Sequence, residues 1–271
     1  MESAPKVRGM KAARFYGASE GLKIEDVPLP EIGSNEILVR VEGAGICHSD
    51  LHILEGDLPL PNLPTTLGHE NAGFVEEIGD ELDIQGTGIE QGTPVAVYGP
   101  WGCGNCHVCS RGEYQLCNVI EWVGIGHDGG YAEYLRVPNP EYLVRLDSLE
   151  PTEAAPLTDA GVTSYRAVRR AEKSLTPSRP IVIIGIGGVG QYAVQFADML
   201  TGSDVIAVDI DDEKLDKAER LGADVTVNGD KNLSSEVRQV SNDGGGTAGT
   251  GTGAGAGAGA VLDFVGTDET L

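Results

Sequence analysis

Four of the five cysteines in this 271-residue chain lie in one short stretch, "CGNCHVCSRGEYQLC" (103–117). Four thiolates so close together satisfy a tetrahedral zinc ion and leave no open position for a substrate. An iron–sulfur cluster also uses four cysteines, and the absence of any metal is a further alternative. The spacing favours a closed, structural zinc site, whose ligands would be Cys103, Cys106, Cys109 and Cys117.

The fifth cysteine belongs to a second candidate metal site, whose residues are less obviously grouped in the sequence. Cys47 lies in "GICHSDLHILEG" (45–56), and His69 follows in "LGHENAG" (67–73). One thiolate, one imidazole and nearby carboxylates can hold zinc and leave a position open for a substrate. A single cysteine is more often a small core residue, so each piece alone is weak. Their joint presence ahead of a dinucleotide-binding pattern favours a catalytic zinc site.

That dinucleotide-binding pattern is "GIGGVG" (185–190), which follows the apolar run "PIVIIG" (180–185) and opens a helical pattern. In this context the first glycine permits a tight turn, the second lets backbone approach a pyrophosphate, and the last allows close packing of the helix. The N-terminus of the helix then supplies N–H groups to the phosphates. The predicted cofactor-binding residues of this loop are Gly185, Gly187, Gly188, Val189 and Gly190.

A carboxylate follows at the position that selects between NAD and NADP. Asp209 ends the next predicted strand, about 20 residues after the last glycine, where it can accept a hydrogen bond from the ribose 2′-hydroxyl. It would also repel a 2′-phosphate, so we expect NAD. Lys214 lies close by, which keeps NADP as an alternative.

Two halves of the chain must position these residues. The first half is predicted to be β-rich, an irregular barrel or sandwich with long loops, because short apolar or alternating runs are separated by Gly, Pro and Asn. The expected strands are 36–46, 71–79, 94–99 and 129–137. Both metal motifs fall in its loops, where functional residues concentrate.

The second half changes to an alternation of strands and helices, which predicts a doubly wound parallel sheet. The expected strands are 180–185, 204–210, 224–229 and 261–266, and residues 154–171 form a helix-rich connector. We place the domains at 1–158 and 159–271. Residues 244–260, "GGGTAGTGTGAGAGAGA", are predicted to be a flexible loop. The usual dinucleotide fold has about six strands, so the second domain is expected to be incomplete.

The composition excludes several classes of partner. Forty-two acidic and 19 basic residues give a net charge of −23, which argues against nucleic acid and anionic membranes. The sequence has neither a long apolar span nor a signal peptide, so we expect a cytoplasmic protein, where clustered cysteines more often hold metal than disulfides. The acidic, lysine-poor surface suits high salt, and we expect a salt-loving host.

The motifs "GICHSDLH", "GHENAG", the four-cysteine segment, "GHDGGYAEY", "PLTDAGVTSY" and "GIGGVG" occur in this order. Together they resemble the zinc-dependent, medium-chain alcohol dehydrogenase family, with prokaryotic and archaeal members most similar. The resemblance runs from about residue 10 to residue 266. It implies a GroES-like catalytic domain followed by a Rossmann domain, two zinc ions per chain, NAD, and an alcohol substrate. It also implies a homo-oligomer, a dimer or tetramer, for a full-length chain.

The resemblance also implies the ligands of the catalytic zinc. Cys47 and His69 match two of them, and Asp159 in "PLTDAG" stands where the third is Cys or Asp. Glu70 matches a residue that approaches or replaces the metal-bound water. Asp50 matches the carboxylate that orients the metal-bound histidine. The alternatives are a helix N-cap for Asp159 and an ordinary turn residue for Asp50.

The remaining roles implied by the resemblance concern protons, cofactor and substrate. Ser49 matches the hydroxyl that accepts the proton of the alcohol, and His52 matches the end of the relay to solvent. His48 is expected near the cofactor pyrophosphate, or else in an exposed loop. Thr163 is expected beside the nicotinamide. Trp101 is expected to line the substrate pocket, with ordinary packing as the alternative.

Two rival functions stay open. One is a polyol or sugar dehydrogenase of the same superfamily. The other is a truncated, inactive zinc-binding remnant, because the segment that completes the catalytic domain in this family and the last strands of the cofactor sheet are not in this sequence.

Overall fold

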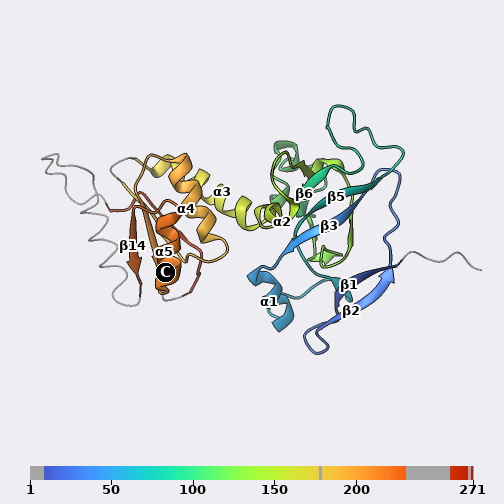
Figure 1. Ribbon diagram of the computed structural model, residues 1–271, viewed down its shortest axis with the longest axis horizontal. Coiled ribbons are helices and arrows are strands. Elements are labelled where there is room, and N and C mark those ends of the chain that lie inside the picture. The colour runs from blue at the N-terminus through green and yellow to red at the C-terminus, as the bar shows by residue number, and fades with distance from the viewer. Residues whose placement is uncertain (1–8, 177–178, 230–256, 268–269, 271) are drawn as a thin grey trace, which may run out of the picture. The chain divides into compact units, whose positions relative to one another are not determined.

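The computed structural model describes residues 9–176, 179–229, 257–267 and 270 (Figure 1). The chain divides into two compact units, Met1–Asp159 and Ala160–Leu271. Residues 244–256 of the expected glycine-rich loop lie outside the described residues. Among the helices of the described ranges, none has the length and apolar character needed to cross a membrane.

The first unit is built on a five-stranded antiparallel sheet with the order β10-β3-β5-β6-β11. Its strands are β3 (Ile37–Gly45), β5 (Glu70–Ile78), β6 (Pro94–Val97), β10 (Tyr134–Val137) and β11 (Leu143–Arg145). Side chains on alternate positions, such as Ile37 and Val39, are buried in one core cluster with Val95 and Val97. Figure 1 shows β3, β5 and β6 side by side.

Two smaller sheets and several short helices complete this unit. One sheet has the order β2-β1-β4 and the other β7-β8-β9. These strands are β1 (Gly9–Phe15), β2 (Leu22–Pro28), β4 (Thr65–Thr66), β7 (Pro100–Trp101), β8 (Glu121–Val123) and β9 (Gly126–His127). The helices are α1 (His48–Glu55), α2 (Pro151–Ala154) and the 3₁₀ turns η1 (Cys109–Arg111), η2 (Tyr114–Leu116), η3 (Pro140–Tyr142) and η4 (Ala155–Thr158).

Among the predicted strands of the first unit, the run 129–137 differs most from the structure. The run 129–137 forms a strand only over β10, from Tyr134. Its first residues pair elsewhere: the amides of Gly129, Gly130 and Tyr131 donate to the carbonyls of residues 66, 68 and 67. The two-residue alternation of the sequence does not reveal this change of partner.

The second unit is a parallel sheet with the order β14-β13-β12-β15. Its strands are β12 (Ile181–Ile184), β13 (Val205–Asp209), β14 (Val225–Asn228) and β15 (Ala260–Asp263), and its helices are α3 (Ala160–Ala171), η5 (Glu172–Ser174), α4 (Gly190–Leu200) and α5 (Asp212–Arg220). This is the order 3-2-1-4, the first four strands of the usual six-stranded dinucleotide-binding fold, and α4 and α5 pack against the sheet (Figure 1).

The central strand confirms the prediction of a strand buried on both faces. Ile181 and Ile183 pack in one core cluster with α4, while Val182 and Ile184 pack in a second cluster with β13 and β14. All four side chains are buried. The two units together confirm the predicted class, a β-rich domain followed by a doubly wound α/β domain.

Candidate active site

The first unit brings three predicted metal ligands together. Cys47 precedes α1, His69 precedes β5, and Asp159 follows η4. Their ligand atoms all lie within 4.8 Å of one another. Asp159 Oδ2 lies 3.5 Å from Cys47 Sγ and 3.5 Å from His69 Nε2. Zinc–ligand bonds of about 2.0–2.3 Å in a tetrahedron require ligand atoms about 3.3–3.8 Å apart, so these donors fit zinc.

His69 is where negative charge converges. Its ring is 2% exposed, and the carboxylates of Asp50 and Asp159 approach its two nitrogens. Burial lowers the pKa of His69, but the neighbouring carboxylates of Asp159 and Asp50 and the Cys47 thiol outweigh burial and raise it to about 12. Two carboxylates and a thiol around one buried imidazole demand a positive charge. A proton supplies it on the bare protein, and a divalent cation supplies it when metal binds.

Asp50 approaches the nitrogen of His69 that does not face Asp159. Cys47 is the N-cap of α1, and Asp50, three residues on, accepts the Cys47 amide at 2.9 Å in a capping box. The same oxygen, Oδ2, accepts the Tyr131 hydroxyl at 2.8 Å. The other oxygen lies 3.5 Å from His69 Nδ1. Burial raises the pKa of Asp50, but the bonds to His69, Cys47 and Tyr131 lower it overall, so the carboxylate stays ionised.

Tyr131 is a site residue that sequence reasoning did not single out. It lies in "GHDGGYAEY", which contributed to the family resemblance but received no role of its own. The signal was therefore present in the motif. Nothing in its spacing from Asp50, 81 residues earlier, indicates contact.

Glu70 is the predicted metal-site residue that the structure does not bring into the cluster. Its side chain is buried against Gly45, its partner residue on β3, where an added Cβ would collide with Glu70 Oε2. The group of close ligand atoms contains Cys47, His69 and Asp159 but not Glu70. Because Glu70 begins β5, strand pairing brings it opposite Gly45, and its role near the metal-bound water stays a prediction.

The proposed proton relay lies on α1. Ser49 Oγ is 3.7 Å from Cys47 Sγ, which places it at the edge of the metal group. His52 is solvent-exposed near the end of the helix, and its Nδ1 lies 3.7 Å from Asp57. His48 is also exposed, and its ring lies 4.8 Å from that of His52. An exposed His48 agrees with both of its alternatives, a pyrophosphate contact and an exposed loop position.

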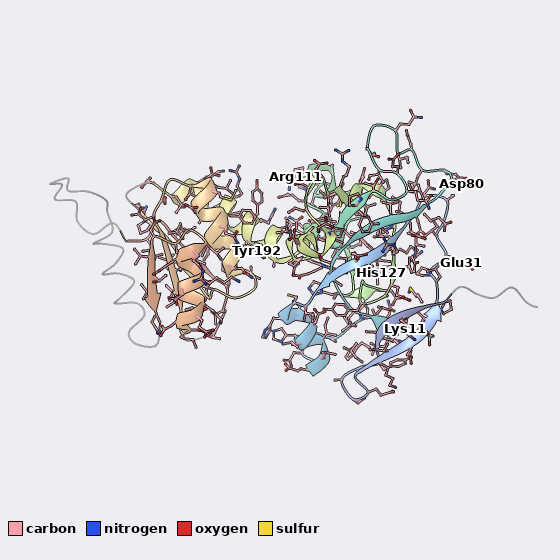
Figure 2. The ribbon with its side chains drawn as sticks, in the orientation of Figure 1. Lys11, Glu31, Asp80, Arg111, His127 and Tyr192 are labelled. Carbon is pink, nitrogen blue, oxygen red and sulfur yellow. The ribbon has the colours of Figure 1, made fainter. Side chains whose placement is uncertain are left out.

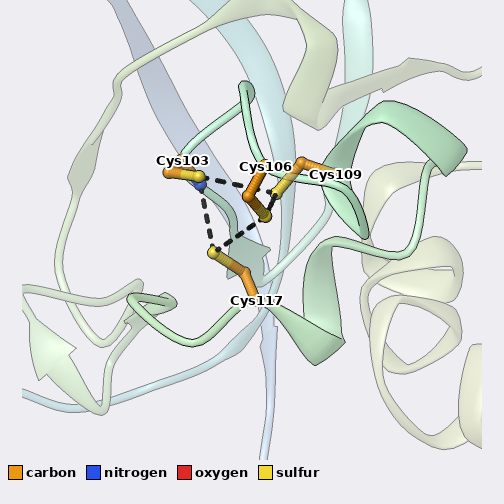
Figure 3. A group of neighbouring side chains, drawn as sticks. All are labelled: Cys103, Cys106, Cys109 and Cys117. Atoms are coloured by element: carbon orange, nitrogen blue, oxygen red, sulfur yellow. Dashed lines mark hydrogen bonds between the residues drawn. The ribbon is translucent and has the colours of Figure 1, made fainter.

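The four clustered cysteines converge as their spacing predicts (Figure 3). The Sγ–Sγ distances are 3.4 Å for Cys106–Cys109, 3.9 Å for Cys103–Cys109 and 4.0 Å for Cys106–Cys117. Zn–S bonds of about 2.3 Å require edges of about 3.8 Å, so the cage fits zinc. Backbone and thiol hydrogen bonds lower the pKa of Cys106 to about 6, while burial raises that of Cys109 to about 12.

The structure supports the packing alternative for Trp101. Its side chain is 4% exposed within the core of the first unit, and its indole N–H donates to the Tyr98 carbonyl at 2.9 Å. Its ring stacks on Tyr142 with a centroid distance of 6.1 Å. A ring so enclosed offers almost no surface to a substrate, so the expected role as a pocket wall is corrected to a core role.

In the second unit, the glycine-rich loop has the geometry of a pyrophosphate cradle. Gly185 has a φ of +85°, which side chains other than glycine rarely adopt. A Cβ on Gly190 would collide with the Gly185 carbonyl, whereas one on Gly187 or Gly188 would meet nothing within 4 Å. The first and last glycines are therefore needed by the fold, and the middle two leave exposed backbone open to a ligand. Val189 precedes α4 as its N-cap residue.

Asp209, at the end of β13, faces this loop. Its Oδ2 accepts the Ile186 amide at 2.7 Å, and its Oδ1 accepts the Asp211 amide and lies 3.6 Å from Lys214 Nζ. The carboxylate thus ties the glycine-rich turn to the next strand, a second role that sequence reasoning missed. Thr163 is exposed in the first turn of α3.

Comparisons with known proteins agree with this combination of a metal-binding β domain and a dinucleotide-binding domain. Residues 33–148 match the alcohol dehydrogenase GroES-like domain, and residues 188–271 match the zinc-binding dehydrogenase domain. An NAD-dependent alcohol dehydrogenase of Sulfurisphaera tokodaii is 44% identical, covering 88% of this chain and 70% of the relative. The chain belongs to the zinc-dependent, medium-chain alcohol dehydrogenase family.

Solved structures give the same result. The alcohol dehydrogenase of Aeropyrum pernix superposes with a TM-score of 0.79 at 40% identity, covering 85% of this chain and 68% of the other. The D-arabinose dehydrogenase of Sulfolobus solfataricus gives 0.83 at 35% identity, covering 97% and 76%.

Proposed function

We propose that this chain is a zinc-dependent alcohol dehydrogenase that oxidises a primary or secondary alcohol to an aldehyde or ketone, with NAD as the hydride acceptor. The observation that carries the proposal is the convergence of Cys47, His69 and Asp159. Three protein donors leave a fourth zinc position for a substrate, as in catalytic zinc sites, whereas four cysteines close the other site. The family membership supports the same conclusion.

The chain's own residues would handle the proton. Bound zinc supplies a Lewis acid that acidifies an alcohol. Cys47, His69 and Asp159 would hold that ion, and Asp50 would fix the ring of His69. Ser49, beside Cys47, would accept the proton of the alcohol, and the exposed His52 would release it to solvent.

The glycine-rich loop and Asp209 support NAD as the cofactor. Exposed backbone at Gly187 and Gly188 leaves room for the pyrophosphate. A nearly buried carboxylate at the end of β13 suits a ribose 2′-hydroxyl and disfavours a 2′-phosphate. Lys214, 3.6 Å from Asp209, offsets part of that repulsion. The S. tokodaii relative bears the name of an NAD-dependent enzyme.

A sugar is the second candidate substrate. A D-arabinose 1-dehydrogenase (NADP(+)) of Saccharolobus solfataricus is 36% identical over the whole of this chain. The metal group alone does not separate a simple alcohol from a sugar, since both present a hydroxyl to zinc.

The protein's surroundings are part of the same proposal. We place it in the cytoplasm of a salt-loving host, as the acidic composition suggests, acting on a small alcohol and assembling as a dimer or tetramer. Charged side chains such as Lys11, Glu31, Asp80 and Arg111 project from the described surface (Figure 2). Self-repulsion among so many carboxylates weakens as salt shortens the range of the charge interaction.

One assay tests these assignments together. NADH and NADPH formation would be followed with short alcohols and with D-arabinose, in low and high salt, alongside zinc content per chain. We expect two zinc ions and NAD-linked turnover of an alcohol. Two zinc ions without turnover would favour the inactive remnant, turnover of D-arabinose alone the sugar dehydrogenase, and NADP-only activity would contradict the role of Asp209. Unchanged structure and activity in low salt would contradict the salt-loving host.

A further inference from the structure

The segment "GHDGGYAEY" is interlocked with the segment that carries His69. Asp128 accepts the Thr66 amide at 2.8 Å, and the Gly129 amide donates to the Thr66 carbonyl at 2.7 Å. The Tyr131 amide donates to the Leu67 carbonyl at 2.9 Å. The two loops therefore form a short ladder that ends next to His69.

The two loops can lie this close together because glycines stand at their points of contact. A Cβ on Gly129 would collide with the Gly68 carbonyl, and a Cβ on Gly68 would lie 2.6 Å from Tyr131 Cδ1. The loops can touch backbone to backbone only because both positions are glycine. The result is that the ring of Tyr131 lies against Gly68, the residue before His69.

The hydroxyl of Tyr131 then reaches the carboxylate behind the metal group. It lies 2.8 Å from Asp50 Oδ2 and 2.9 Å from the Gly45 carbonyl. One hydroxyl has one proton to donate, and the ionised carboxylate is the stronger acceptor. The Cys47 amide and the Tyr131 hydroxyl thus occupy one oxygen of Asp50 and turn the other toward His69.

Two of the three buried side-chain atoms that lack a hydrogen-bond partner in the described residues face each other at the end of this series of contacts. Within the described residues, Asp50 Oδ1 and His69 Nδ1 are buried without a hydrogen-bond partner. They lie 3.5 Å apart, so the Asp50 carboxylate is placed to keep the proton on Nδ1 when Nε2 gives up its own proton to bind metal. Fixing this tautomer is what a carboxylate behind a metal-bound histidine does.

We propose that Tyr131 is a positioning residue of the metal site, acting through Asp50 on His69. Without its hydroxyl, Asp50 keeps only the Cys47 amide and can rotate away from Nδ1. The imidazole then loses its preference for the tautomer that offers Nε2 to a metal. Groups that hydrogen-bond a metal ligand, as Asp50 would, typically contribute about 10- to 100-fold to metal affinity, and Tyr131 acts through Asp50. The inference rests on the metal site of the proposed function.

Tyr131→Phe tests this directly, because it keeps the ring against Gly68 and removes only the hydroxyl. We expect Zn²⁺ affinity at the Cys47–His69–Asp159 site to fall about 10- to 100-fold, measured by competition with a chelator in the absence of substrate. With Co²⁺ in this site, the visible absorption bands should also shift. The control is Tyr142→Phe, which removes a hydroxyl bonded to the Gly102 carbonyl beside the four cysteines and should leave this affinity and these bands unchanged.

Comparing Tyr131→Phe in the wild-type and Asp50→Asn backgrounds tests the role of Tyr131 even if the single substitution affects folding. If Tyr131 acts through Asp50, Tyr131→Phe should cause little further loss of metal affinity in an Asp50→Asn background. Wild-type affinity and bands in Tyr131→Phe would overturn the proposal, as would losses that simply add. Metal binding is measured without turnover, so an enzyme that binds metal normally but oxidises no alcohol would instead contradict the proposed function.

Discussion

Cys47 Sγ lies 3.5 Å from Asp159 Oδ2, although 112 residues separate them. With His69 they form a three-donor group in the first unit, separate from the four-cysteine cage of the same unit. An open site and a closed site in one domain should respond differently to the loss of a single thiol, and the first two predictions use that difference.

Cys47→Ser should remove the open site's metal and leave the closed one. We expect zinc content to fall from two ions to one and turnover to fall by about 10³-fold or more, because a Lewis acid contributes several kcal/mol to the barrier. The melting temperature should change little. Zinc analysis, steady-state assays and thermal denaturation check this. Retention of two zinc ions with full activity would show that Cys47 is not a ligand.

Cys109→Ser should act on stability first. Cys109 is buried and lies within 4 Å of two other thiols of the cage. Losing a structural zinc removes folding free energy directly, so we expect the melting temperature to fall by more than about 5 °C. Zinc bound at Cys47 should survive at temperatures where the variant is folded. Ser110→Ala, an exposed neighbour, is the control; if both variants melt like the wild type, the cage holds no structural metal.

The raised pKa of His69 predicts how the protein without its catalytic metal responds to pH. A folded-state pKa of about 12, against 6.5 for the free side chain, means that the bound proton stabilises the fold fully below pH 6.5. That contribution is lost progressively as the pH rises toward 12. With the closed-site zinc retained, unfolding free energies should therefore decrease from pH 7 to pH 10 more in the wild type than in His69→Gln.

Zinc affinity at this site should increase with pH, whereas the stability of the metal-free site decreases. Because Zn²⁺ must displace the proton from His69, apparent zinc affinity at this site should increase with pH, by about tenfold per pH unit for each proton released. Equilibrium competition with a chelator of known pH dependence measures this. An affinity independent of pH between 7 and 9 would contradict the protonated state of His69.

Alanine substitutions at two glycines of the glycine-rich loop 185–190 should have different effects. A Cβ at Gly190 would meet the Gly185 carbonyl, so Gly190→Ala should lower the melting temperature by several degrees. A Cβ at Gly187 would meet nothing within 4 Å of protein, so Gly187→Ala should fold normally and weaken NAD binding by about tenfold or more, since the backbone can no longer approach the pyrophosphate. Calorimetry and NADH fluorescence titration separate the two effects, and normal NAD binding by Gly187→Ala would contradict the cradle.

Asp209→Ser should change cofactor preference. Removing the carboxylate removes both the acceptor for the ribose hydroxyl and the repulsion of a 2′-phosphate. We expect kcat/KM with NAD to fall by about tenfold and the NAD-to-NADP ratio to fall further. Some loss of stability should accompany this change, because the Ile186 amide loses its partner. The exposed Asp216 on α5 offers the control, Asp216→Ser; an unchanged cofactor ratio in Asp209→Ser would rule out the assignment.

Local patterns in the sequence determined the fold class and the donor types. The run 180–185 predicted a strand buried on both faces, because only such a strand tolerates continuous apolar side chains. The spacing of the four cysteines predicted their cage, since ligands a few residues apart in a loop can reach one ion. Each of these features is contained within a short segment, so its physics can be read without knowing the rest of the chain.

Tertiary structure decided which distant residues meet. Strand pairing brought Glu70 against Gly45, and core packing enclosed Trp101. The ladder between two loops placed the Tyr131 hydroxyl on Asp50. These contacts depend on how segments far apart in the sequence pack against each other. No periodicity within a single segment encodes that packing.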